Sequence, residues 1–449
     1  MNRKALTCYL LLLVSVSGVS AQPEVFPLQL SFDKAIKTSL QNNPDMRIRE
    51  LNYRMSVEQL KESKLQLVPQ VYGRYDIRHN IIIPSTLVPV GKFNPDLPPD
   101  EVIPVKFGTT WYSGAGLFAS VSLFDPAIIG DIREKNATIA ISEIEKKITE
   151  KDLEYQTGRA YLICLISYEQ YKFAADDTLN SHNQLNETQH RYNEGYLKLT
   201  DLNQVVLNHN NSRSRFHEAK RVMDDSWKTL IYWMGFPQDQ QILPQLTDSL
   251  PVLIERFDIK LDSESNLLST PEILLLKSKT DLDKVRLRNI KFSFLPTVNL
   301  SGIYSGDYYN NSLRLSDTDY WFGNSNLSLT LKVPITEGIS RVKRLSRQKL
   351  MVETANEDLA SALNKKQLEV NKSRDNIAFY RKEMTLKESN MKISESNYRA
   401  AFSLFREGRI LPSELSEAEM SFKQAKFDYL NSVFSYIESA LFLKRITEY

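Results

Sequence analysis

Cysteine is nearly absent from this sequence. Of its two cysteines, Cys8 lies in an apolar N-terminal run, and only Cys164 lies beyond residue 21. A single remaining thiol excludes a disulfide framework. Cys164 sits in an apolar helical pattern, which favours a buried structural position over a reactive thiol.

Catalytic signatures are missing as well. The sequence has no Gly-x-Ser-x-Gly, no phosphate-binding loop and no His-Glu-x-x-His. His182 and His190 are eight residues apart, which is about 12 Å along a helix and too far to share a metal ion directly. His209 and His217 repeat this spacing. We therefore expect surface histidines, no catalytic, cofactor-binding or metal-binding residues, and no enzyme.

An excess of charge of one sign is also lacking. The formal net charge is +2, which equals the contribution of Arg3 and Lys4, so the rest of the chain is formally neutral. It has no basic stripe for nucleic acid, and acidic pairs such as Asp176-Asp177 are expected on solvated helix faces.

The apolar run from Ala5 to Val16 is too short for a transmembrane helix. With the small residues that follow, it predicts a secretory signal peptide over residues 1–21 rather than a buried helix.

What the sequence does contain is a sevenfold apolar repeat on both sides of the segment from Phe405 to Leu415. Its members are Leu363, Val370, Ile377, Met384, Met391, Tyr398 and Phe405 upstream, and Leu415, Phe422, Tyr429, Tyr436 and Leu443 downstream. Such a repeat indicates helices that supercoil against neighbours. Gly408 suits the end of one helix and Pro412 the start of the next. These residues predict a helix–turn–helix hairpin with long arms.

A second hairpin of the same design is predicted earlier in the chain. Glu194-Gly195 is the counterpart of Glu407-Gly408. The sevenfold positions around it are Ile141, Ile148, Tyr155 and Leu162 before the turn, and Leu202, His209, Phe216 and Met223 after it. Two such hairpins indicate an internal duplication.

Each repeat also contains a pair of predicted strands. In the first repeat, residues 22–235, we expect a helix from Ser31 to Lys64, a strand over 69–83, a proline-rich loop over 84–108, a strand over 109–124 and the helical hairpin with its turn at Gly195. In the second, residues 271–449, we expect a helix, a strand over 295–309, a loop over 310–319, a strand over 320–333 and the helical hairpin with its turn at Gly408. Residues 236–270 predict an irregular equatorial segment beside the helices.

The strands alternate apolar and polar residues over about ten positions, as transmembrane β-strands do. Aromatic residues near their loop ends predict a girdle at the membrane interface, made of Trp111, Tyr112, Tyr308, Tyr320 and Trp321. A soluble antiparallel sheet with one wet face is the alternative. Four spanning strands cannot close a barrel alone, and lipid tolerates no open sheet edge. We therefore predict a mainly α fold with transmembrane β-strands, in which three chains share one twelve-stranded barrel.

In these features the chain resembles the TolC-like outer-membrane efflux protein family. The resemblance rests on the duplicated plan, the Glu194-Gly195 and Glu407-Gly408 turns, and the Leu295-Pro296 step into a strand with its counterpart Val68-Pro69. It implies a homotrimer whose twelve-stranded β-barrel in the cell outer membrane continues into a long α-helical barrel in the periplasm. Such a channel is the passive exit duct of a tripartite efflux pump or type I secretion system, for small molecules or polypeptides. Its implied partners are outer-membrane lipid, a periplasmic adaptor (membrane fusion) protein and an inner-membrane transporter, with no cofactor and no nucleic acid.

Two other classes of function are weighed against this one. A structural periplasm-spanning coiled-coil scaffold or adhesin would not transport, and the strand pairs with their aromatic ends argue against it. A soluble periplasmic enzyme is disfavoured by the missing catalytic signatures. The sequence does not indicate which substrate a duct would export.

The resemblance also implies roles for residues around the two turns. Gly195, Lys198 and Gly408 would form the tips that dock the adaptor. Acidic residues just after the second turn ring the pore constriction in the family, and Glu414 and Glu417 match them. Their i, i+3 spacing lets them share a helix face. The alternative is that they are first-turn acids stabilised by the helix dipole.

The remaining implied residues belong to a latch between the hairpins that closes the pore gate. Thr200 and Asp201 match the partners on the first hairpin. Phe405 stands where a tyrosine would donate a hydrogen bond, so that bond is expected to be absent. Arg409 is one position away from the expected arginine, which places the details of the latch in question.

Overall fold

The computed structural model of the chain describes residues 27–89, 98, 102–237, 243–258, 267–335 and 338–447. The predicted signal peptide, residues 1–21, lies outside them. The chain divides into two compact units, one made of Met1–Pro44, Lys151–Ser263 and Lys372–Arg445 and the other of Asp45–Glu150, Glu264–Asn371 and Ile446–Tyr449. We call them the hairpin unit and the sheet unit. Among the described helices, none combines the length and the apolar content required to cross a membrane.

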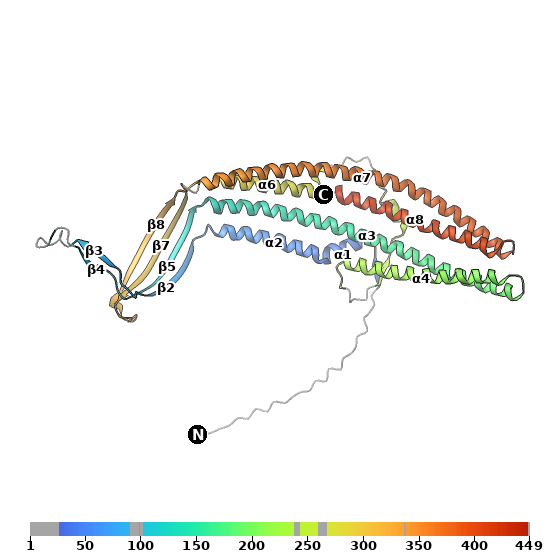
Figure 1. Cartoon of the computed structure of the whole chain (residues 1–449), viewed down its shortest axis with the longest axis horizontal. Helices are drawn as coiled ribbons and strands as arrows, with labels where there is room; N and C mark the ends of the chain where they lie inside the picture. Colours follow the sequence, from blue (N-terminus) through green and yellow to red (C-terminus); the bar gives the residue numbers. More distant parts are fainter. Residues whose placement is uncertain are drawn as a thin grey trace, which may run out of the picture. The chain divides into compact units, whose positions relative to one another are not determined.

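The sheet unit contains a four-stranded antiparallel sheet (Figure 1). Its strands are β2 (Gln70–His79), β5 (Trp111–Phe124), β7 (Thr297–Asn310) and β8 (Trp321–Lys332), in the order β2-β5-β7-β8. The pairing of β5 with β7 joins strands that are far apart in the sequence.

The register of this sheet places apolar residues of all four strands on one face. Leu117 of β5 lies opposite Gly73 of β2 and Tyr304 of β7, and Gly302 of β7 lies opposite Leu327 of β8. In the single chain this face is exposed: Leu117 is 58%, Tyr304 73% and Leu327 76% accessible. An exposed apolar face of this kind marks a surface that binds another protein or a membrane.

The proline-rich segment 84–108 differs from the predicted loop. β3 (Ser85–Pro89) and β4 (Val102–Lys106) form a separate antiparallel hairpin, in which Leu87 lies opposite Pro104. Proline is tolerated here because each strand of a two-stranded hairpin has one edge without a ladder, where the missing N–H is not needed.

Helices α2 (Pro44–Leu65) and α6 (Pro271–Phe292) complete the sheet unit with the first parts of α3 (Pro126–Asn193) and α7 (Gly338–Arg406). Ser56 of α2 shares a 2.8 Å hydrogen bond with Ser142 of α3, and the amide of Asn289 in α6 donates to the Gly130 carbonyl oxygen of α3 (2.8 Å). Thr280 of α6 donates to a carbonyl oxygen of α7 (3.3 Å). Neighbouring helices are therefore joined in the order α2, α3, α6, α7.

The helix predicted from Ser31 to Lys64 is in fact two helices. α1 (Phe32–Asn42) ends at Asn43, whose backbone is extended (φ −64°, ψ 129°), and α2 begins at Pro44. The ring of a proline disfavours the helical conformation in the residue before it, which explains the break.

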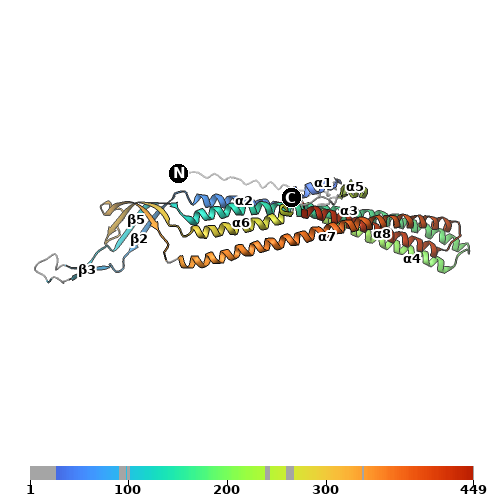
Figure 2. The ribbon, with the colours of Figure 1, turned by 90° about the horizontal axis from the view of Figure 1, so that it is seen from above.

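The hairpin unit is built on two long helical hairpins. α4 (Leu199–Trp233) folds back along the second part of α3, and α8 (Pro412–Thr447) along the second part of α7 (Figures 1 and 2). Members of the sevenfold repeat are buried in this unit, namely Leu162, Leu202, Met223, Ile377, Phe405, Leu415, Tyr436 and Leu443. Cys164 is also fully buried, and burial raises the pKa of its thiol to about 12.

The segment 236–270 is more regular than predicted. It contains β6 (Leu243–Leu246), α5 (Leu250–Arg256) and the short helix η2 (Leu267–Ser269). β6 pairs in parallel with β1 (Pro27–Leu30). After β6, the Asp248 carboxylate accepts the N–H of Phe32 (2.6 Å) and the hydroxyl of the buried Tyr161 (2.9 Å). The first bond joins the start of α1 to the segment after β6, and the second joins that segment to α3.

Candidate functional site

Both hairpins end in the same kind of glycine turn. Gly195 follows α3 with φ of +83°, and Gly408 follows α7 with φ of +74°. At each turn the glycine N–H bonds the carbonyl three residues back (3.0 Å), and the next N–H bonds the carbonyl five residues back. This is the Schellman pattern, in which glycine is preferred because of its positive φ.

Arg191, in the last turn of α3, joins the two hairpins. Its guanidinium donates to the carbonyl oxygens of Phe405 (3.0 Å) and Arg406 (2.8 Å) at the C-terminal end of α7, where the helix dipole favours a cation. Glu187, one turn earlier, pairs with the same guanidinium (2.6 Å). The guanidinium carbon lies 5.2 Å from the centre of the Phe405 ring, and the Phe405 side chain is buried. Sequence reasoning missed this arginine.

The other predicted latch residues stay within their own hairpins. The side chain of Thr200 is exposed. Asp201 accepts the backbone N–H of Lys198 (3.1 Å) and so caps the start of α4. Arg409 pairs with Glu407 (3.1 Å) inside the second turn. Of the predicted latch set, Phe405 is the residue that the structure places in a contact between the hairpins.

Glu414 and Glu417 both lie on the exposed side of α8, near its start at Pro412. Leu415 and Ser416, between them, are buried in the hairpin unit. The two carboxylates are therefore free of the core, as a ring of pore acids requires. Because they lie in the first two turns of α8, they are also near the positive end of its dipole.

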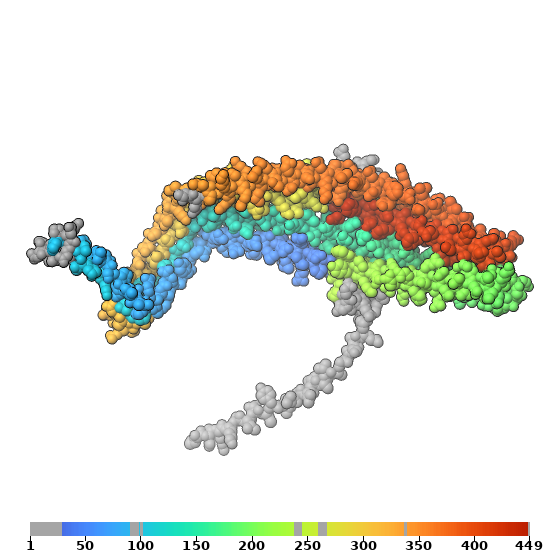
Figure 3. All heavy atoms as spheres, viewed as in Figure 1, coloured from blue at the N-terminus to red at the C-terminus, as the bar shows by residue number. Residues whose placement is uncertain are grey.

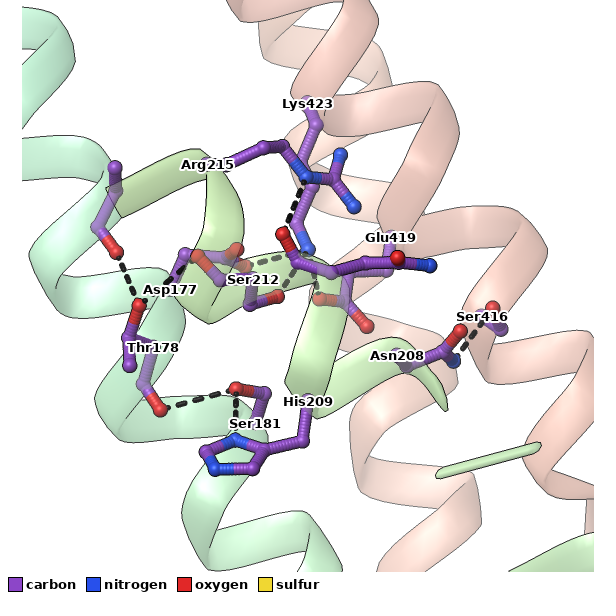
Figure 4. Close-up of polar contacts among 12 residues, drawn as sticks. Asp177, Thr178, Ser181, Asn208, His209, Ser212, Arg215, Ser416, Glu419 and Lys423 are labelled. Carbon is purple, nitrogen blue, oxygen red and sulfur yellow. Dashed lines mark hydrogen bonds and ion pairs between the residues drawn. The ribbon is translucent and has the colours of Figure 1, made fainter. Parts of the chain in front are cut away.

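Farther from the turns, a buried ionic cluster joins three helices (Figure 4). Lys423 of α8 lies with its Nζ 2.6 Å from the Asp177 carboxylate of α3 and in contact with the Glu419 carboxylate of α8. Ser212 of α4 is 3.4 Å from the same Nζ. The side chains of Lys423, Asp177 and Glu419 are only 12%, 9% and 6% exposed. The expectation that Asp177 lies on a solvated face is therefore wrong.

A surface pocket of about 910 Å³ opens beside this cluster. Asp177 and Lys423 form part of its wall, together with Phe173 of α3, Val222 of α4 and Met420 of α8. Figure 3 shows the surface hollowed between the green atoms of α4 and the red atoms of α8. Asp177 and Lys423 thus lie at the wall of a pocket that is open at the surface.

Two carboxylates share one ammonium in this cluster, and the ionisation of Glu419 is perturbed. Burial raises the pKa of Glu419 above its ordinary value of 4.5, and repulsion by Asp177 adds to the effect, while Lys423 opposes it. Tyr398 of α7 faces the same carboxylates, and burial raises the pKa of its phenol. Folding thus makes Glu419 easier to protonate than it is in the unfolded chain.

We expect Glu419→Gln to raise the melting temperature of the protein at pH 8. A raised folded-state pKa means that the stabilisation by the protonated carboxyl is complete below the unfolded-state pKa and is lost as the pH rises through the folded-state value. Glutamine keeps the neutral form at every pH, and Lys423 keeps its 2.6 Å partner Asp177. Thermal unfolding between pH 4 and pH 8 tests this, because the difference from the wild type should vanish toward pH 4. A difference independent of pH would contradict the assignment.

Between Asp177 and the turn at Gly195, several polar side chains of α3 are buried. Ser181, Gln184 and Thr188 are buried, and Gln184 Nε2 and Thr188 Oγ1 have no hydrogen-bond partner among the described residues. Each buried unpaired polar atom costs about 1–3 kcal/mol, so this part of the interface is weaker than an apolar one. Asp177, Gln184 and Arg191 are seven residues apart, but they lie one position beyond the sevenfold stripe that Ile141 to Leu162 define.

In the sheet unit, predicted girdle residues gather at one end of the sheet. The ring of Tyr308 lies 5.6 Å from that of Trp321 and 6.3 Å from that of Tyr320, centre to centre. Tyr308 is fully buried, and its hydroxyl donates to the Ser312 carbonyl oxygen (2.7 Å) and accepts the Arg314 N–H (2.9 Å). Tyr308 therefore holds the loop that follows β7.

The other two girdle residues begin β5. The ring of Trp111 lies 4.3 Å from that of His79 in β2, centre to centre. Tyr112 points to the opposite face, where its hydroxyl donates to the Asp307 carboxylate (3.1 Å) and its ring lies 5.3 Å from that of Tyr309. A place at a membrane interface remains a prediction for this aromatic group.

No protein-family model and no curated protein sequence matches this chain. Solved structures do match it. The CmeC outer membrane channel of Campylobacter jejuni aligns with 100% of this chain and 94% of its own, with a TM-score of 0.73 at 15% identity. CusC, described in connection with transmembrane channel formation, aligns with 94% of this chain and 93% of its own (TM-score 0.74, 14% identity). The open state of the MtrE outer membrane channel of Neisseria gonorrhoeae aligns with 93% and 88% (TM-score 0.69, 15% identity). The chain thus shares the fold of these outer-membrane channels, which confirms the mainly helical, TolC-like fold of the single chain. The twelve-stranded barrel of three chains remains a prediction.

Proposed function

We propose that this chain forms the outer-membrane channel of a tripartite efflux pump or type I secretion system. The observation that carries the proposal is the register of the β2-β5-β7-β8 sheet, which collects the apolar residues of four strands on one exposed face. Lipid can cover such a face. The fold shared with outer-membrane channels supports the same reading.

In this proposal three chains assemble around one pore. The sheet of a single chain has two outer strands, β2 and β8, each with one neighbour in the order of the sheet. In a bilayer these edges must be paired, and three copies would pair them edge to edge in a barrel of twelve strands. The helical hairpins would then form a tunnel in the periplasm.

The hairpin turns at Gly195 and Gly408 would be the periplasmic tips of this tunnel and would dock an adaptor protein. Cysteines introduced at Lys198 and Arg409, whose side chains are exposed, should crosslink to a periplasmic partner in intact cells. A cysteine at Lys349, exposed on the part of α7 that belongs to the sheet unit, serves as the control. Equal capture by all three positions, or capture by none, would count against docking at the tips.

The test of the channel itself is single-channel recording of the detergent-purified protein in a planar bilayer, combined with its mass in solution. A trimer that conducts supports the proposal. A water-soluble monomer without conductance would contradict the proposal and favour the alternative function, a periplasmic coiled-coil scaffold.

The same recording tests the pore acids. Three copies of Glu414 and Glu417 would make two carboxylate rings, which favour cations. We expect the double variant Glu414→Gln/Glu417→Gln to lower the cation-to-anion permeability ratio severalfold. Glu395→Gln is a control on α7, where the half-buried Glu395 pairs with the exposed Arg399. If the double variant keeps the wild-type selectivity, the two acids do not line the pore.

A further inference from the structure

The first hairpin brings together two histidines that are 27 positions apart in the sequence. His182 of α3 and His209 of α4 have ring centres 5.5 Å apart, with their planes inclined by 47°. Both line a surface pocket of about 390 Å³, whose other walls include Thr178, Arg213 and Phe216. From these contacts we propose that His182 and His209 form a binding site for a divalent transition-metal ion of the copper, nickel or zinc type.

The separation of the rings suits a shared ion. Metal–nitrogen bonds are about 2.0–2.1 Å, so two imidazoles on one tetrahedral ion have ring centres roughly 5 Å apart. In the part of the chain that the structure describes, no group of three or more His, Cys, Asp or Glu side chains is placed to hold a metal. The site therefore has two protein ligands, and because His182 is exposed, water can complete the coordination.

The hydrogen bonds of His209 prepare it to act as a ligand. The hydroxyl of Ser181 donates its proton to the Thr178 carbonyl oxygen (3.0 Å), so it accepts a hydrogen bond from Nδ1–H of His209 (3.0 Å; Figure 4). This leaves the lone pair on Nε2, and a second hydrogen bond of this kind is typical of metal-binding histidines.

The ring of His182 can also present a free nitrogen to the ion. On His182, Nε2 lies 3.3 Å from the Asn186 amide. When the amide turns its oxygen to this nitrogen, Nε2 carries the proton and Nδ1 is free to bind the ion. The charge of Arg213 opposes a cation, so the expected affinity is moderate, and Cu²⁺, which binds such sites most tightly, is the suitable probe.

The experiment is equilibrium dialysis and electron paramagnetic resonance of the full-length protein, without a polyhistidine tag, with Cu²⁺ at one equivalent per chain. We expect one bound ion per chain with coupling to imidazole nitrogen, lost in His182→Gln and in His209→Gln. His190→Gln and His217→Gln, eight residues away on the same two helices, should keep it. Ser181→Ala should weaken binding by about tenfold through loss of the bond to His209.

Three results would overturn the site. The first is absence of bound copper in the wild type. The second is a copper signal in both His182→Gln and His209→Gln that equals the wild-type signal. The third is a loss of bound copper in the His190 and His217 variants as large as in the His182 and His209 variants. The elution volume and melting temperature of each metal-free variant show that it is folded. Because an ion shared by α3 and α4 links the arms of the hairpin, added copper should raise the melting temperature of the wild type and not of the His182 and His209 variants.

Discussion

Replacing Lys423 by methionine is expected to destabilise the hairpin unit by about 3–5 kcal/mol at pH 7.5. The Lys423 ammonium lies between two buried carboxylates, 2.6 Å from Asp177 and in contact with Glu419. Methionine keeps the length and the apolar stem of the side chain but removes the charge. The two carboxylates are then left in a site of low dielectric, where an uncompensated charge is costly.

Thermal unfolding in detergent, followed by tryptophan fluorescence to which Trp227 and Trp233 on α4 contribute, measures this loss. It should shrink toward pH 4, because burial raises the pKa of Glu419 and its protonation removes one of the two stranded charges. Lys392→Met is the matched control, since Lys392 pairs with Glu388 on an exposed surface of α7 and should matter little. Equal melting temperatures for the two methionine variants would show that the buried cluster contributes no stability.

A further variant separates lost charge balance from lost packing. Adding Asp177→Asn and Glu419→Gln to Lys423→Met replaces the whole buried cluster by neutral side chains. Replacing every member of a buried ionic group by uncharged side chains often leaves the free energy of unfolding unchanged. The triple variant should therefore recover most of what Lys423→Met alone loses. If it does not recover, the cost comes from packing and not from the stranded carboxylates.

The parts of the fold that follow from local periodicity could be predicted from the sequence. Sevenfold spacing placed Ile377, Phe405, Leu415 and Tyr436 on a buried stripe, and all four are buried. Helical geometry alone determines which positions share a face. Alternation along the strands likewise determines the two faces of each strand, although the register that aligns four strands depends on pairing across the chain.

Where the prediction failed, either a single residue or a distant partner decided the structure. Pro44 ends α1, and an exposed edge allows Pro104 inside β4. The pairing of β1 with β6 joins segments more than 200 residues apart, and no local pattern contains that information. Their parallel alignment depends on contacts such as those of Asp248 with Phe32 and Tyr161.

The candidate site was predicted less well, because polar residues were assigned to solvent by type. The structure buries Asp177 beside Lys423 and uses Arg191 to join the hairpins, although both are charged. Neither lies on the sevenfold positions that Ile141 to Leu162 define, which continue at 176 and 190, so that spacing did not indicate them. The pair formed by His182 and His209 could not be predicted, because it depends on how α3 and α4 are aligned after the turn at Gly195.

Gly235→Ala is expected to be nearly as damaging as Lys423→Met, and Gly195→Ala provides its matched control. Both glycines have positive φ, +79° and +83°, so each alanine carries the strain of the left-handed conformation, about 1–2 kcal/mol. A Cβ at Gly235 would in addition lie 2.6 Å from the Asn42 carbonyl carbon and 2.7 Å from the Asn43 Cα, whereas nothing lies within 4 Å at Gly195.

The backbone at Asn42 and Asn43 cannot move aside freely, because the side chains of Ser39 and Asn43 both donate to the Trp233 carbonyl oxygen at the end of α4 (2.7 and 3.0 Å). Overpacking against a fixed neighbour adds about 1–3 kcal/mol, for a total loss of roughly 2–5 kcal/mol. Melting temperatures of the two alanine variants decide the matter. Equal losses would mean that only the positive φ requires glycine at residue 235. A larger loss for Gly235→Ala would show that the end of α4 and the end of α1 hold each other in place, which fixes α1 against the first hairpin.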